Sequence, residues 1–252
     1  MGRSPRTWHH DDVGYGPDTY GESFADVYDD WYGDMDGLSD CVETIYGLSL
    51  GGMVLELGVG TGRIAIPLAQ AGCQVVGVDA SPAMLSQLAR RDPGGAVQQH
   101  LGTMAGPLPD GPFQVVFVAY NTFFNMTSAR DQLACLTEVR RCLASGGHLV
   151  IEAFVPDRFT PERGVDARTT ADGIVLNVTR NDPVSQVVLG QQVQLGEDGV
   201  RLRPWQIRYL TPLQLDELAV SVGLGLVARW SDWAGTLFDH ESQRHVSVYA
   251  PR

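Results

Sequence analysis

The chain has 252 residues, 44% of them hydrophobic, and a formal net charge of −12. This length and composition suit one α/β domain with an appended or inserted subdomain. The acidic balance argues against nucleic acid and anionic membranes as partners, because both are bound through basic surfaces. All 18 basic residues are arginine, which excludes a Schiff-base mechanism through lysine.

The four cysteines show no C-x-x-C or Cys/His spacing, so the sequence predicts no metal site and four buried free thiols. The N-terminal residues have no apolar segment typical of a signal peptide, and no apolar run reaches membrane-spanning length. These features predict a cytoplasmic protein without a membrane segment.

Residues 1–19 are polar and predict a flexible N-terminal arm. Residues 20–47 predict helical structure in which Phe24, Tyr28, Trp31 and Tyr32 share one face. This aromatic face either packs on the core or closes as a lid over a bound ligand. The phenol groups favour the lid, since a tyrosine can pack and hydrogen-bond at once.

The segment 54–63, VLELGVGTGR, organises the middle of the chain. A short apolar strand is followed by Gly58, Gly60 and Gly62 and then by a helical pattern. The next predicted strand ends in Asp79, 21 positions after Gly58. A glycine turn with a carboxylate at this spacing is typical of a site that binds a nucleoside through its ribose hydroxyls.

The glycine spacing is G-x-G-x-G and not the dinucleotide pattern G-x-G-x-x-G. Glu56 also stands at the end of the strand, where its charge would repel a pyrophosphate and attract a cation. S-adenosylmethionine (SAM) carries a sulfonium, an ammonium and a ribose but no phosphate. The residues therefore favour SAM as the ligand.

Together these residues resemble the first motif and the acidic end of strand two in class I SAM-dependent methyltransferases, over roughly residues 50 to 155. The resemblance implies an α/β fold with a Rossmann-like, doubly wound seven-stranded sheet and a SAM-binding core at 48–156. It also implies that Glu56 holds the ammonium group, that Asp79 takes both ribose hydroxyls, and that the three glycines approach the methionine moiety. Arg63 either pairs with the SAM carboxylate or is a solvated residue at the helix start. The further cofactor contacts implied are Tyr20, Tyr28, Ala80, Met84, Gly102, Thr103, Met104, Ala119 and Tyr120.

One motif departs from the family. Where the resembled enzymes commonly have Gly-Asp-Met, with the Asp accepting from the adenine amino group, this chain has Gly102-Thr103-Met104. The Thr103 hydroxyl can accept a hydrogen bond but brings no charge, which weakens the adenine assignment at this position.

The remaining elements follow in order. A strand at 113–119 leads into a helix at 128–143, in which Ser128 and Asp131 resemble a capping box, and then into a strand at 148–154. Residues 157–172 are loop-like, and alternating segments at 174–180, 187–195 and 200–209 predict a small antiparallel sheet inserted at 157–210. Residues 211–252 supply a final helix and two strands.

This order of elements is similar to that of sugar N,N-dimethyltransferases, in which the inserted sheet covers the acceptor. The resemblance implies that Tyr32, in a Y-D-x-x-Y pattern, faces the active site. Asn125 stands where those enzymes carry a histidine, which puts an amino-sugar acceptor in doubt. Aromatic side chains of the lid and the inserted sheet favour a hydrophobic or aromatic acceptor, and Arg208 suits an acidic group on it. The residues expected to contact the acceptor are Trp31, Asn121, Phe124, Trp205, Arg208 and Trp233.

The expected reaction is SN2 transfer of a methyl group from SAM to a nitrogen or oxygen, less readily a carbon, of a small secondary metabolite. Rate enhancement would come mainly from positioning the acceptor, with Tyr32 and Asn125 orienting it. A hydroxyl acceptor would need a base, for which Tyr32, His240 and His245 are candidates, although His245 also suits a structural role. Two other functions stay open: a SAM-fold enzyme that catalyses cyclisation or rearrangement without methyl transfer, and a binding protein that keeps SAM for stability. A homodimer is left open as the assembly.

Overall fold

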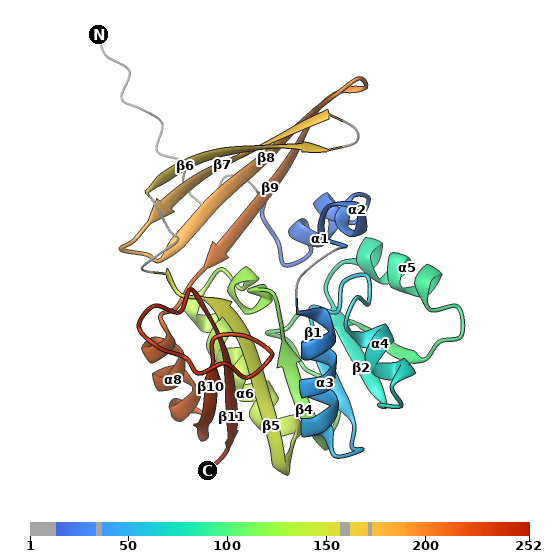
Figure 1. Cartoon of the computed structure of the whole chain (residues 1–252), viewed down its shortest axis with the longest axis vertical. Coiled ribbons are helices and arrows are strands. Elements are labelled where there is room, and N and C mark those ends of the chain that lie inside the picture. The colour runs from blue at the N-terminus through green and yellow to red at the C-terminus, as the bar shows by residue number, and fades with distance from the viewer. Residues whose placement is uncertain (1–13, 34–36, 157–161, 171–172) are drawn as a thin grey trace.

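The computed structural model describes residues 14–33, 37–156, 162–170 and 173–252, and it contains two separate sheets (Figure 1). The larger sheet has seven strands in the order β10-β11-β5-β4-β1-β2-β3, with β11 antiparallel to both of its neighbours. Its strands are β1 (Val54–Leu57), β2 (Val75–Asp79), β3 (Val97–Leu101), β4 (Phe113–Val118), β5 (Leu143–Phe154), β10 (Leu224–Trp230) and β11 (Arg244–Pro251).

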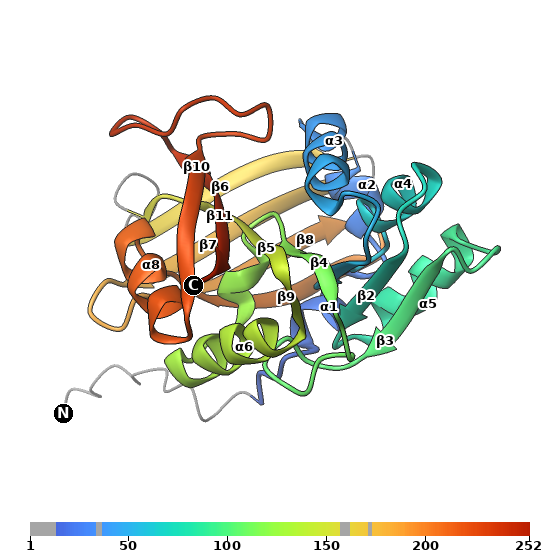
Figure 2. The ribbon, with the colours of Figure 1, turned by 90° about the horizontal axis from the view of Figure 1, so that it is seen from below.

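Helices cover both faces of this sheet, as Figure 2 shows. On one face lie α3 (Leu38–Ser49), α4 (Ala65–Gln70) and α5 (Pro82–Arg91), and on the other α6 (Ala129–Cys142) and α8 (Pro212–Ser221). Local capping fixes where several begin: the Ser81 side chain accepts from the Met84 N–H, and Thr211 forms a full capping box. The predicted doubly wound α/β fold is confirmed.

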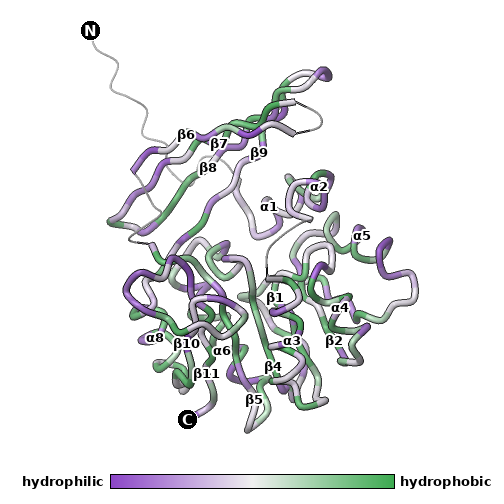
Figure 3. The backbone as a smooth tube through the Cα atoms, in the orientation of Figure 1, coloured by the Kyte–Doolittle hydropathy of each residue, from purple (hydrophilic) through white to green (hydrophobic). Residues whose placement is uncertain are grey.

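The central strands are buried from both sides, and Figure 3 shows β4 and β5 as hydrophobic. Every residue of β1 is buried, and β4 exposes part of Gln114 alone. Since β1 is parallel to β2 and β4, the carboxyl ends of these three strands meet at one edge. Ligands of open α/β sheets bind at this edge.

The smaller sheet is antiparallel and has four strands, where the sequence predicted three. They are β6 (Arg163–Thr170), β7 (Gly173–Asp182), β8 (Val187–Gly196) and β9 (Gly199–Arg208). The additional strand, β6, lies in the segment interpreted as a loop. Its sequence, RGVDARTT, has little apolar alternation, and it is a strand because it pairs with β7 over its whole length.

The segment predicted as a helical lid is divided into α1 (Thr19–Phe24), α2 (Tyr28–Tyr32) and α3. Only α1 and α2 lie between the two sheets, whereas α3 packs on the seven-stranded sheet (Figure 1). Residues 25–27 turn between α1 and α2, and Gly37 begins α3 in a left-handed conformation with φ +83°, so one continuous helix does not form. We therefore call residues 19–32 the lid. Most of the predicted arm, residues 1–13, lies outside the described residues.

Candidate functional site

A cavity of about 380 Å³ opens beneath the lid at the carboxyl edge of the parallel strands. The lining residues come from the chain before and within the lid, the turn after β1, the end of β2 and the start of α5, the loop after β3, and the segment from the end of β4 to the first turn of α6. The lining residues are Tyr15, Gly16, Pro17, Tyr20, Gly21, Tyr28, Gly58, Gly60, Asp79, Ala80, Met84, Thr103, Met104, Ala105, Thr122, Asn125, Met126, Thr127 and Asp131. Nine of the fifteen predicted cofactor contacts are in this set.

Asp79 is held rigidly at the cavity wall. Its Oδ2 accepts from the Gly60 N–H at 2.8 Å and its Oδ1 from the Ser81 N–H at 2.9 Å. Burial raises the pKa of Asp79, and these backbone N–H groups oppose that shift. Gly60 has φ +54°, and a Cβ there would meet only Met84 Sδ, at 4.0 Å, so the backbone is open to the cavity. A fixed carboxylate with unused lone pairs beside bare backbone fits a ribose with two hydroxyls.

Glu56, next to the last residue of β1, is a buried carboxylate. Its Oε2 has no hydrogen-bond partner among the described residues. Burial raises the pKa of Glu56 well above its usual range, and the positive charge of Arg63 partly offsets that effect. A buried carboxylate oxygen without a partner costs free energy unless a cation or donor arrives. The ammonium group of SAM fits this position.

Arg63 connects the turn after β1 to the lid. Its Nη1 donates to the Tyr32 carbonyl at 2.6 Å and its Nη2 to the Tyr28 hydroxyl at 3.0 Å. Its guanidinium also lies over the Tyr120 ring, 4.2 Å from the centroid. Arg63, Tyr28 and Tyr120 line a smaller cavity next to the first, together with Glu56 and Ala119. Arg63 is therefore packed among lid tyrosines and is not a solvated residue at the helix start.

Two of the predicted glycine contacts have structural roles. A Cβ on Gly62 would lie 2.3 Å from Leu88 Cδ1, so Gly62 allows α4 to pack against α5. The Gly102 N–H donates to the Asp79 carbonyl at 3.0 Å and shapes the turn after β3. Neither glycine is in the lining of the large cavity.

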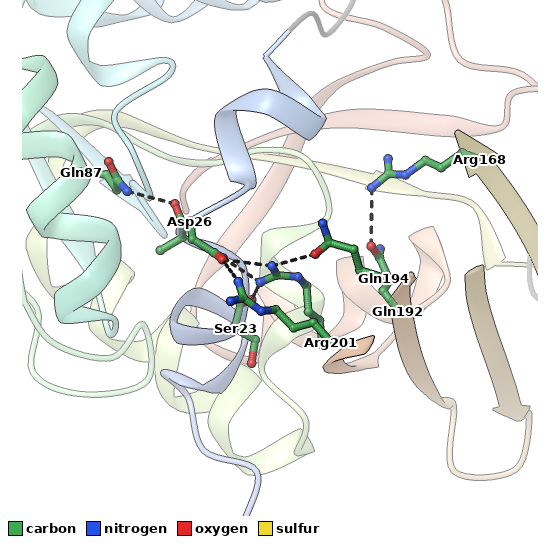
Figure 4. Close-up of polar contacts among 9 residues, drawn as sticks. Ser23, Asp26, Gln87, Arg168, Gln192, Gln194 and Arg201 are labelled. Atoms are coloured by element: carbon green, nitrogen blue, oxygen red, sulfur yellow. Dashed lines mark hydrogen bonds and ion pairs between the residues drawn. The ribbon is translucent and has the colours of Figure 1, made fainter. Parts of the chain in front are cut away.

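The lid is hydrogen-bonded to α5 on the core side. Glu22 accepts from Ser81 Oγ at 2.8 Å and from the Ala83 N–H at 3.0 Å. The Gln87 side chain donates to the Ala25 carbonyl at 3.2 Å, as Figure 4 shows. These bonds place α1 over the end of the cavity that Asp79 lines.

On its other side the lid is ion-paired to the four-stranded sheet (Figure 4). Asp26 Oδ1 accepts from Arg203 Nη1 at 2.6 Å, and Asp26 also pairs with Arg201. Arg203 is only 2% exposed and bonds in addition to the Ser23 carbonyl and to Gln194. The lid therefore links α5 to the four-stranded sheet through side-chain contacts that no sequence pattern predicted.

Several predicted acceptor contacts face this space between lid and sheet. The Tyr32 hydroxyl accepts from the Gln192 side chain at 3.2 Å. Arg168 lies over the Trp31 ring, 4.6 Å from the centroid. Trp205 packs against the lid cluster and donates from Nε1 to Asn177 Oδ1 at 3.1 Å. Asn125 lines the large cavity itself.

Three predicted site residues are instead part of the core. Phe124 is fully buried with its ring against Phe154, because the short 3₁₀ helix η2 (Thr122–Asn125) turns it inward. Trp233 is buried in the cluster on the α3 face. Burial lowers the pKa of His245 to about 3, and its Nδ1 lies 2.8 Å from Ser247 Oγ. None of the three lines the cavity.

Two further predicted contacts make bonds within the protein. Asn121 Oδ1 accepts from the Phe154 N–H at 2.7 Å, which fixes the end of β5. Arg208 Nη1 donates to Gln132 Oε1 at 2.5 Å, which ties β9 to α6. Both side chains position the walls of the site and are absent from the lining of the cavity.

Two titratable residues of the cavity were not predicted from the sequence. Tyr15, within the predicted arm, accepts from the Gln206 N–H at 3.1 Å, and burial raises its pKa to about 12. Asp131, interpreted as part of a helix cap, also lines the cavity. The only sequence signal for Tyr15 was its position as an aromatic residue in a polar segment. The only sequence signal for Asp131 was its capping pattern with Ser128.

Comparisons with known proteins identify the family and agree with the fold. Residues 54–147 match the model of a methyltransferase domain. The solved CcbJ methyltransferase from Streptomyces caelestis is 35% identical, with a TM-score of 0.88 over 94% of this chain and 99% of that one. A cypemycin N-terminal methyltransferase from Streptomyces is 28% identical over 203 residues, 79% of this chain and 82% of that protein. SAM-bound CalS10, an amino pentose methyltransferase from Micromonospora echinaspora, shares the fold at 20% identity, with a TM-score of 0.66 over 95% of this chain and 99% of that one.

Proposed function

This chain belongs to the SAM-dependent methyltransferases, of the small-molecule, natural-product type, and we propose that it methylates a nitrogen, ahead of an oxygen, of its acceptor. The observation that carries this choice is the set of titratable groups around the cavity. They are three tyrosines and two aspartates, with no histidine among the described lining residues.

An oxygen acceptor must lose its proton to become a good nucleophile, whereas a neutral amine already carries a free lone pair. Burial raises the pKa of Tyr15 to about 12 and that of Tyr20 well above its usual range. Both phenols are therefore protonated at neutral pH and act as donors. His245 is buried, and neither His240 nor His245, the two imidazoles suggested as bases, is among the lining residues. Of the two lining carboxylates Asp79 is proposed to bind ribose, so the site is equipped mainly to orient an acceptor.

Bound SAM supplies an electrophilic methyl group on its sulfonium. Around it, Asp79 accepts from the ribose hydroxyls, Glu56 faces the ammonium, and Arg63 holds the lid tyrosines in place. The aromatic lid keeps water from the reacting atoms, and fixed orientation of the acceptor supplies much of the rate.

The acceptor is proposed to lie where the cavity meets the inner face of the four-stranded sheet. Trp31 and Trp205 provide apolar surface there, and Arg168 adds a positive charge over one of them. Tyr32 and Asn125 are proposed to orient the nucleophile. The names of two similar proteins, an N-terminal methyltransferase and an amino pentose methyltransferase, also favour an amine acceptor. The proposed acceptor is thus a small metabolite with a hydrophobic or aromatic part and an amine.

The test uses matched acceptors that differ only in an amine or a hydroxyl at one position. The purified protein is incubated with SAM and each acceptor, and the products are analysed by mass spectrometry. Gain of one methyl mass on the amine, with equimolar S-adenosylhomocysteine, is the expected result. Methylation of the hydroxyl alone would refute the choice of atom. An isomerised acceptor with SAM unconsumed would favour the cyclisation or rearrangement alternative instead.

A second measurement addresses the orienting residues. Asn125→Ala should lower kcat more than it lowers SAM affinity, because Asn125 is proposed to touch the acceptor. Asn121→Ala is the matched control, since its side chain bonds to the β5 backbone. Asn121→Ala should mainly lower the stability of the fold. Equal kinetic profiles for the two variants would count against the orienting role.

A further inference from the structure

The cavity is lined by two carboxylates, one from the seven-stranded sheet and one from a helix that covers it. Asp79 comes from the end of β2, and Asp131 from the first turn of α6. Asp79 accepts a hydrogen bond from the turn after β1 and is proposed to bind ribose through its remaining lone pairs. Asp131 has no assigned role in the reaction, although it lines the same cavity as Thr103, Met104 and Ala105.

The loop after β3 runs back along α6 and brings these residues together. The Leu108 N–H donates to Glu138 at 3.1 Å, and Arg141 donates to the Leu108 carbonyl at 2.6 Å. Asp131 precedes Glu138 by seven helical residues, about 10 Å along the axis. Ala105 precedes Leu108 by three residues, which span at most about 10 Å. The three residues from Leu108 back to Ala105 are therefore long enough to reach the first turn of α6. Ala105 and Asp131 line the same cavity there.

The Asp131 carboxylate is oriented and still has acceptor capacity. Ser128 Oγ donates to Asp131 Oδ2 at 2.7 Å, and the Asp131 N–H donates back to Ser128 Oγ at 3.0 Å. Among the described residues, no other side chain hydrogen-bonds to this carboxylate. Oδ1 therefore keeps its lone pairs for a donor in the cavity.

The chemistry of the nucleobase completes the argument. With ribose at Asp79, the base extends toward the loop after β3, where the side chains are Thr103, Met104 and Ala105. The adenine amino group offers two N–H donors, and a carboxylate accepts them more strongly than a neutral hydroxyl does. We infer that Asp131 recognises the exocyclic amino group of the adenine of SAM and so selects adenine over a 6-oxo purine. This inference rests on the cofactor site proposed above.

The test compares S-adenosylhomocysteine with S-inosylhomocysteine, in which a carbonyl replaces the amino group. Both affinities are measured by calorimetry on the full chain. The wild type should prefer the adenine ligand by about 10- to 100-fold, because the carbonyl would face the carboxylate and leave it unpaired. Asp131→Asn should bring the ratio of the two dissociation constants close to one, since an amide can serve either base. Thr103→Asp in the Asp131→Ala background should restore the preference.

Ser128→Ala separates recognition from capping, because it removes the cap hydrogen bond and keeps the carboxylate. This variant should lose thermal stability and retain the ligand ratio. If Asp131→Asn and Ser128→Ala weaken both ligands equally, Asp131 is only a cap residue and the inference is overturned. If Asp131→Asn raises the KM of the acceptor without changing the ligand ratio, the carboxylate faces the acceptor and the inference is again overturned. Failure of the wild type to bind S-adenosylhomocysteine would instead refute the cofactor site itself, and this inference with it.

Discussion

Replacing Asp26 with alanine should loosen the lid from the four-stranded sheet, because it leaves Arg203 buried without its carboxylate. Breaking a fully buried ion pair from one side costs about 3–5 kcal/mol, and an exposed pair contributes about 0.2–1 kcal/mol. The Arg203 side chain is 3% exposed and that of Asp26 is 47% exposed, so this pair lies between the two cases. Arg203 also keeps its bonds to Ser23 and Gln194. We expect a loss of about 1–2 kcal/mol in the free energy of unfolding.

The assay is chemical denaturation of the full chain, together with the affinity for S-adenosylhomocysteine. Asp29→Ala is the matched control, since Asp29 pairs the lid with Arg91 and both side chains are 41% exposed. It should cost about 0.2–1 kcal/mol. The double variant Asp26→Ala/Arg203→Met should recover part of the loss by removing the orphaned charge. Equal effects of the two single variants, or no recovery in the double variant, would refute the reasoning.

The same ion pair has a defined pH dependence. Burial opposes ionisation of Asp26, but hydrogen bonding and charge from Arg203 and Arg201 outweigh it and lower its pKa below 3.8. Its contribution is complete above the unfolded pKa and is lost as pH falls through the lower folded value. The stability gap between wild type and Asp26→Ala should therefore persist at neutral pH and close in strong acid.

Other predictions address the cofactor site and the core. Asp79→Asn should weaken S-adenosylhomocysteine binding about 10- to 100-fold by calorimetry, whereas Asp110→Asn, at a side chain that is 98% exposed, should not. Gly62→Ala should lower the melting temperature more than Gly72→Ala: both have positive φ, but only at Gly62 would the new Cβ clash, at 2.3 Å. Burial lowers the pKa of His245 to about 3 in the folded protein, so the wild type should lose free energy of unfolding as pH falls from 6.5 to about 3. His245→Gln should lose less over the same pH range. An unchanged acid profile in that variant would contradict the buried, neutral imidazole.

The parallel core could be predicted from the sequence because its signals are local. A buried strand, a glycine turn and Asp79 at a fixed distance along the chain are one supersecondary unit, and each part constrains the next. The aromatic composition of the lid was predicted, but the turn at 25–27 and the left-handed conformation of Gly37 were not. β6 could not be predicted, because its residues are stabilised as a strand by β7 and not by their own pattern.

Three residues that were expected in the active site lie in the core for one physical reason. His245, Phe124 and Trp233 are types that often occur in active sites, and nothing local distinguishes an aromatic ring in a cavity from one in a core.

Asp131 shows the opposite case, because its predicted capping role is confirmed and a second role is inferred from the structure alone. Its pairing with Ser128 is a complete local explanation, so the sequence offered no reason to look for a second role. The cap uses the Asp131 N–H and one carboxylate oxygen, which leaves the other oxygen available. The path of the loop after β3 along α6, fixed by contacts of Leu108 more than 20 residues away in sequence, brings Asp131 into the lining of the cavity. A residue that belongs to a local capping motif can therefore still bind a ligand through the atoms that the motif leaves unused.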